Sequence, residues 1–119
     1  MRKKSNKINL KKLLSDPEKT GAQKLALFAW LNLGIVESLT KGHLTPADAI
    51  RIFFNGENCL FVRQGLANKN ADAIMGRGVQ LADLFDVLPA KEPQREFQRE
   101  LAAIRSLCLN ILDEKRLAA

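Results

Sequence analysis

The sequence predicts a single all-α domain, a bundle of four to six helices. Apolar residues make up 46% and charged residues 27% of the 119 residues, which is an ordinary globular composition and a common domain length. A stretch at about 22–39 is apolar on nearly all sides, as a central helix is. Another, at about 93–116, carries its apolar residues at helical spacing. These observations favour helices packed on helices.

The central helix has recognisable signals at both ends. Asp16 before Pro17 is typical of an N-cap followed by proline at the first helical position, so we expect the helix to begin there. Residues 25–36 carry no charge. A cation and then a glycine, Lys41 and Gly42, predict its end.

Thr45, Pro46 and Asp48 predict the start of a second helix. They place a hydroxyl at the N-cap, proline at N1 and an acid at N3, where it is close to the positive end of the helix. Asp48 and Arg51 have the spacing of an ion pair. The expected apolar face holds Ala47, Ile50, Phe53 and Phe54.

Asn55-Gly56 leaves two interpretations open for the following segment. Asn-Gly between apolar runs is a strong signal for a β-hairpin, here over residues 51–62. An isolated two-stranded hairpin is only marginally stable, however, and Thr45-Pro46 commits the preceding residues to a helix. We therefore favour a kink or helix end at Gly56, with 57–66 continuing as a helical segment.

Two short helices are expected between residues 71 and 88. Residues 71–75 look helical until Gly76-Arg77-Gly78 interrupts them, and 79–88 form a further helix. This outline resembles a helix-turn-helix only in its spacing. The second helix carries Asp83 and Asp86 and no cation, so it would meet DNA phosphates with the wrong sign of charge.

The C-terminal helix has a regular apolar stripe. Its spacing of four and three residues is typical of helix-on-helix packing. Leu107 and Leu112 widen the stripe, which favours packing inside its own domain; a homodimer through this helix is the alternative. The stripe consists of Phe97, Leu101, Ile104, Cys108 and Ile111.

All of the net charge lies in the first twelve residues. The chain carries +6, and beyond residue 12 thirteen cations balance thirteen acids. We therefore divide the chain into a basic N-terminal arm, residues 1–15, and a helical domain, residues 16–119. The arm is expected to attract an anionic partner through Arg2, Lys3, Lys4, Lys7, Lys11 and Lys12. If 4–14 were helical, lysines would occupy one face and leucines another.

The sequence contains few groups suited to catalysis. A dyad of His43, the only histidine, and Cys59 would require the two to meet in space. No metal-ligand spacing and no phosphate-binding loop is present, so no metal or cofactor is expected. Cys59 and Cys108 are far apart in sequence, which predicts free thiols in a reducing cytoplasm. No segment is long enough to span a membrane.

A second candidate site is a polar cluster beside apolar residues: Glu57, Asn58, Arg63 and Gln64. If these side chains are buried, they must satisfy one another's hydrogen bonds.

The resulting hypothesis is a small non-enzymatic interaction module whose basic arm contacts an anionic partner, most simply a protein. The alternative is a nucleic-acid-associated protein in which the arm makes non-specific phosphate contacts. An enzyme that uses His43 and Cys59 is the third.

Overall fold

The computed structural model describes residues 7–84 and 92–118, and these form helices and no strand. In chain order the helices are α1 (Leu10–Leu13), α2 (Gly21–Thr40), α3 (Pro46–Ile52), α4 (Gly56–Phe61), a π-helical turn η1 (Val62–Leu66), α5 (Lys69–Val79) and α7 (Glu92–Ala118). The all-α prediction is confirmed. No helix among these residues is both long enough and apolar enough to cross a membrane.

The central helix α2 begins later than its proline signal predicts. Thr20 is the N-cap: its hydroxyl accepts a hydrogen bond from the Gln23 N–H, and the Gln23 side chain returns one to the Thr20 N–H. Asp16 instead forms a turn, accepting the Glu18 N–H at 2.9 Å. The prediction that the helix starts at Asp16-Pro17 is wrong, because a reciprocal capping box stands four residues later. The predicted end of α2 is correct, with Lys41 as C-cap and Gly42 at a φ of 78°.

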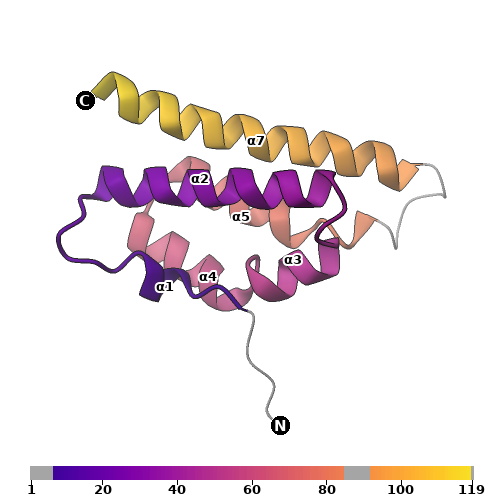
Figure 1. The fold of residues 1–119 in the computed structure, drawn as a ribbon, viewed down its shortest axis with the longest axis horizontal. Helices are drawn as coiled ribbons and strands as arrows, with labels where there is room; N and C mark the ends of the chain where they lie inside the picture. The colour runs from indigo at the N-terminus through magenta and orange to yellow at the C-terminus, as the bar shows by residue number, and fades with distance from the viewer. Residues whose placement is uncertain (1–6, 85–91, 119) are drawn as a thin grey trace, which may run out of the picture.

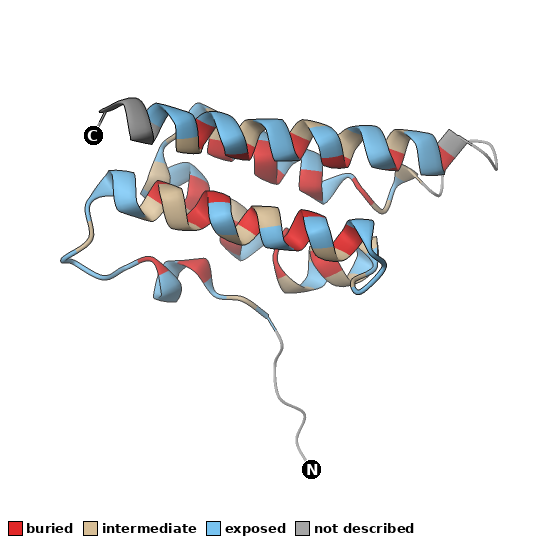
Figure 2. Ribbon diagram, turned by 45° about the horizontal axis from the view of Figure 1, so that its top comes forward, coloured by how far each residue is buried: buried red, intermediate tan, exposed pale blue. Residues whose placement is uncertain are grey.

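The helices α2 and α7 run antiparallel along one side of the molecule, and α5 packs against α7 from within (Figure 1). The predicted stripe on α7 is buried throughout, from Phe97 to Ile111. It therefore packs inside its own domain. Figure 2 shows buried residues on the inner sides of these helices and exposed residues on the outer sides.

One side of α2 departs from the expectation of an all-round apolar helix. Trp30 is 58% exposed, although the interior face of the same helix is buried from Leu25 to Leu39. Residues 23, 30 and 37 recur every seven positions, so Trp30 shares the outer stripe with Gln23 and Glu37. The tryptophan is thus a surface feature of α2.

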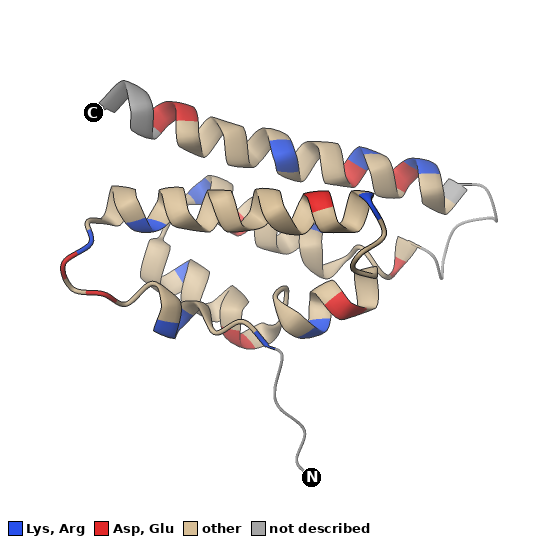
Figure 3. Cartoon of the chain, viewed as in Figure 1, with Lys and Arg blue, Asp and Glu red and all other residues tan. Residues whose placement is uncertain are grey.

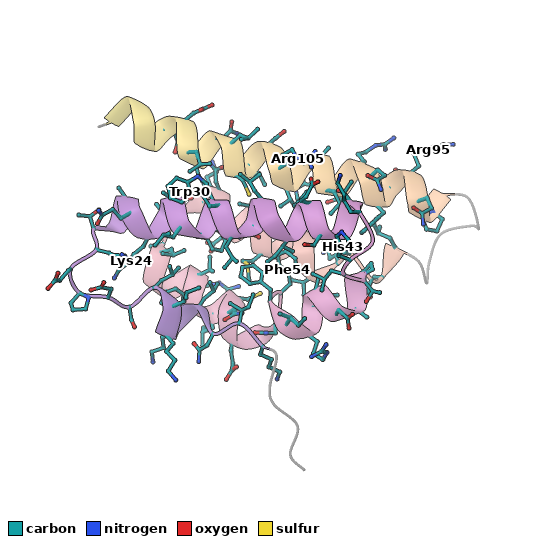
Figure 4. The ribbon with its side chains drawn as sticks, in the orientation of Figure 1. Lys24, Trp30, His43, Phe54, Arg95 and Arg105 are labelled. Atoms are coloured by element: carbon teal, nitrogen blue, oxygen red, sulfur yellow. The ribbon has the colours of Figure 1, made fainter. Side chains whose placement is uncertain are left out.

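Three aromatic rings form the centre of the core. Phe53 lies with its ring centroid 6.2 Å from that of Phe28 on α2, and meets Phe54 edge-to-face at 5.0 Å. Phe54 lies between α2 and the helices below it (Figure 4). Phe53 and Phe54 come from the turn after α3 and are fully buried.

The second helix, α3, begins as predicted. The Thr45 hydroxyl accepts the Asp48 N–H at 3.1 Å, and Arg51 bonds the Asp48 carboxylate at 3.3 Å. Its apolar face differs from the prediction at one position, because Ala47 is exposed and Ala49 is buried instead.

The alternative of a hairpin at 51–62 is wrong. Asn55 is the N-cap of α4: its side chain accepts the Asn58 N–H at 3.0 Å, so Asn-Gly starts a helix here. Successive side chains of a strand point to opposite faces, whereas Phe53 and Phe54 enter the same core. The favoured interpretation, a helical continuation after Gly56, is confirmed.

The expected interruption at Gly76-Arg77-Gly78 is also wrong, because α5 continues through both glycines to Val79. A Cβ at position 78 would overlap the Phe54 ring, so the missing side chain serves helix packing. Without a turn at Gly76, the helix-turn-helix outline is lost. Residues 80–83 form turns, Asp83 is exposed, and residues 85–88 of the predicted helix lie outside the described residues.

We expect the two glycines of α5 to respond oppositely to alanine. Alanine is the better helix former by about 1 kcal/mol, so Gly76→Ala, with open space at its Cβ, should stabilise the domain. Gly78→Ala should destabilise it by about 1–3 kcal/mol, because the methyl group forces the buried Phe54 ring to move. Urea unfolding measures both free energies. Equal stability of the two variants would show that Gly78 is not needed for this packing.

Candidate functional site

The N-terminal segment, residues 7–14, is attached to the domain by the side chain of Asn58. The Asn58 amide oxygen accepts the Leu10 N–H at 3.1 Å, and its nitrogen donates to the Ile8 carbonyl at 2.8 Å and the Phe53 carbonyl at 2.9 Å. A backbone bond from the Ile8 N–H to the Ile52 carbonyl, 2.9 Å, adds a second attachment. Asn58 is 2% exposed, so these bonds form away from water.

Two leucines of this segment enter the core. Leu10 and Leu14 are buried, and each contributes about 1.5–3 kcal/mol by leaving water. Asn9 caps the single turn of α1, accepting the Lys12 N–H at 3.0 Å. The helix spans only residues 10–13, so the supposed helix over 4–14 does not form along residues 7–9, and residues 4–6 lie outside the described residues.

The cations of the arm that the structure describes lie on the surface. Lys7, Lys11 and Lys12 are exposed, and Figure 3 marks the position of lysine on the ribbon of α1. Lys11 and Lys12 form no ion pair with any residue in the ranges 7–84 and 92–114. Their charges are therefore available to a ligand. Arg2, Lys3 and Lys4 lie outside the described residues.

A hollow of about 410 Å³, here named the α4 hollow, lies on one side of α1. The α4 helix widens at its end into the π-helical turn η1, where Gly65 lets the Phe61 ring lie against the backbone. Such single π turns are frequent at functional sites. Leu60, 51% exposed, is the most accessible apolar side chain of the α4 hollow. The full lining is Asn9, Lys11, Glu57, Asn58, Leu60, Phe61, Gln64 and Gly65.

The structure separates the four residues of the predicted polar cluster. Asn58 is buried, whereas Glu57, Arg63 and Gln64 are exposed. Glu57 and Gln64 line the α4 hollow together with Asn58. The buried amide takes its partners from the backbone of the N-terminal segment and of the turn after α3, not from the other three side chains.

Two further hollows lie along α2, and the first of them is also lined by α1. The Leu13 hollow, about 430 Å³, is lined by Ile8, Asn9, Lys12, Leu13 and Leu31. The Trp30 hollow, about 250 Å³, is lined by Lys19, Gln23, Ala26, Leu27 and Trp30. Leu27 and Leu31 are one helical turn apart on α2, so the hollows follow each other along the helix. Leu13 is 55% exposed.

His43 and Cys59 occupy different parts of the fold. His43 is exposed in the turn between α2 and α3, and Cys59 lies in α4, half-buried. No hydrogen bond joins their side chains within the described part of the chain. Burial raises the pKa of the Cys59 thiol, which disfavours the thiolate that a nucleophile needs. Among the described residues, no group of three or more acidic, histidine or cysteine side chains is placed to hold a metal ion.

Sequence reasoning missed two features of this surface. The N-cap Asn9 before Leu10 is a local signal that could have predicted α1. The bonds from Asn58 to Ile8 and Leu10 span 50 and 48 residues, and no local pattern predicts them.

Comparison of the chain with models of known protein families, with curated proteins and with solved structures gives no match.

We expect Asn58→Ala to release the N-terminal segment. The change leaves three backbone groups without a partner and should cost about 1–3 kcal/mol of unfolding free energy. Hydrogen exchange at the Leu10 amide should become faster by tenfold or more, since about 1.4 kcal/mol corresponds to a factor of ten. A suitable control is Asn68→Ala, which removes the N-cap of α5. Unchanged protection of Leu10 in Asn58→Ala would contradict this role of Asn58.

Proposed function

We propose that the chain is a non-enzymatic interaction module that binds an acidic protein partner through the surface around α1. The observation that carries the proposal is that Asn58 holds Lys11 and Lys12 in place beside exposed leucines and hollows. Charges attract and orient a partner, while apolar side chains in hollows supply most of the affinity. Both features occur together on the two sides of α1.

Nucleic acid is the second candidate partner, and it rests on the six cations among the first twelve residues. If all six met phosphates, the logarithm of affinity would fall with the logarithm of salt concentration with a slope of about −5. Exposed leucines gain little from a phosphate backbone. The mixed character of the surface therefore favours a protein over a nucleic acid.

An enzyme remains the weakest candidate. It would depend on Cys59, whose thiol pKa is raised, and on His43, which forms no hydrogen bond to that thiol. None of these three candidate functions requires a cofactor. The free cysteines Cys59 and Cys108 support our placing of the chain in the reducing cytoplasm.

The proposal predicts that reversing two charges on α1 removes a protein partner. Lys11→Glu with Lys12→Glu changes the net charge by four at the proposed surface, so a protein captured from nuclease-treated lysate should be lost. Lys41→Glu with Lys69→Glu makes the same change in net charge at exposed helix ends and should retain that protein. Quantitative mass spectrometry of the captured proteins measures the difference.

Three outcomes would contradict the proposal. Equal capture by both double variants would place the binding surface elsewhere. Capture that disappears on nuclease treatment would favour the nucleic-acid alternative. An activity that is lost in a folded Cys59→Ser variant would favour an enzyme.

A further inference from the structure

We propose that the two hollows along α2 form one docking groove for an amphipathic helix with acidic flanks. The inference rests on the proposed function and names the kind of segment that the acidic partner would insert. One wall of this docking groove is the N-terminal segment at the Leu13 hollow, with Lys12 and Leu13, and Lys19 of the following loop at the Trp30 hollow. The other wall is α2 from Gln23 to Leu31.

The dimensions of the docking groove suit a short helix. Residues 23–31 of α2 extend over about 12 Å at 1.5 Å per residue, slightly more than two helical turns. Leu27 and Leu31 are spaced to contact side chains one turn apart on a ligand helix. A ligand helix of three or four turns would place apolar residues at i, i+4 and i+7 into the Leu13 hollow and the Trp30 hollow.

The charges at the docking groove complement an acidic helix. Lys12 lines the Leu13 hollow and Lys19 lines the Trp30 hollow. Lys24 lies near the start of α2 (Figure 4), three residues before Leu27 and therefore on the same face of the helix. Lys19 forms a 3.9 Å ion pair with Asp16, whereas Lys12 and Lys24 form no ion pair with the described residues. One uncompensated cation, Lys12, therefore lines the Leu13 hollow, and a second, Lys24, lies on the same face of α2 as Leu27.

The shape of the surface favours a peptide over the other anionic ligands. The hollows are concave and mostly apolar, so they fit side chains that project from a helix. The charged phosphates of a nucleic-acid backbone are poorly suited to fill apolar hollows. A bilayer surface is broad and flat, and it would use apolar residues that project from a convex face.

The test measures binding of a synthetic 18-residue helix with leucines at i, i+4, i+7 and i+11 and glutamates on both flanks. Fluorescence anisotropy of the labelled peptide follows binding to the full chain. Trp30 is the only tryptophan and the chain has no tyrosine, so its emission should shift to shorter wavelength as the Trp30 hollow fills. Circular dichroism and urea unfolding confirm that each variant is folded.

Matched leucine variants locate the binding site. Leu13→Ser should weaken peptide binding by about tenfold, because it replaces an apolar anchor of the docking groove by a polar side chain. Leu60→Ser alters an equally exposed leucine of the α4 hollow, and it should change affinity by less than about twofold. A peptide with serines in place of its leucines should not bind.

Other results would overturn the inference and can be separated from failure of the proposed function. If Leu60→Ser weakens binding and Leu13→Ser does not, the helix binds at the α4 hollow. If the serine peptide binds equally well, the contact is electrostatic alone. If the leucine peptide does not bind, while phosphatidylserine vesicles or a 20-base-pair DNA duplex bind with the same dependence on Leu13, the occupant is not a helix. The proposed function fails separately, through equal capture by the two charge-reversal variants.

Discussion

Three hydrogen bonds made by the Asn58 amide hold residues 8–10 of the N-terminal segment against the rest of the domain. Residues 7–9 belong to no helix, so the backbone groups of Ile8 need partners from outside the segment. Asn58 supplies both an acceptor for the Leu10 N–H and a donor for the Ile8 carbonyl, and it also binds the Phe53 carbonyl in the turn after α3. One side chain thus joins α1, α3 and α4, and the α4 hollow and the Leu13 hollow are lined in part by the segment that it holds.

The position of Asn58 depends in turn on how α4 begins. Asn55 accepts the Asn58 N–H, which makes Asn58 the third residue of α4 and directs its side chain back toward Phe53. The turn before Asn55 sends Phe53 and Phe54 into the core, where Phe54 occupies the space left open by Gly78 of α5. The core and the surface therefore share one local structure, the start of α4.

The sequence was informative where the physical cause is local. Thr45-Pro46 and the α7 stripe predicted elements correctly, because a cap or a helical face depends on residues three or four apart. It misled where a residue serves a distant contact. Gly78 looks like a helix breaker, yet it accommodates Phe54; Asn55-Gly56 looks like a hairpin, yet it caps a helix. The role of Asn58 depends on a partner some fifty residues away, so it required the structure.

Attachment of the arm changes what its charge can do. Lysines on a chain that moves freely attract any anion, and they confer little selectivity because they impose no geometry. Once Leu10 and Leu14 are buried and Asn58 holds the backbone, Lys12 stays beside Leu13 and opposite Leu31 of α2. A ligand must then match a cation and an apolar hollow at a set separation, and that requirement excludes most polyanions. Under the proposed function, selectivity thus depends on hydrogen bonds that do not touch the ligand.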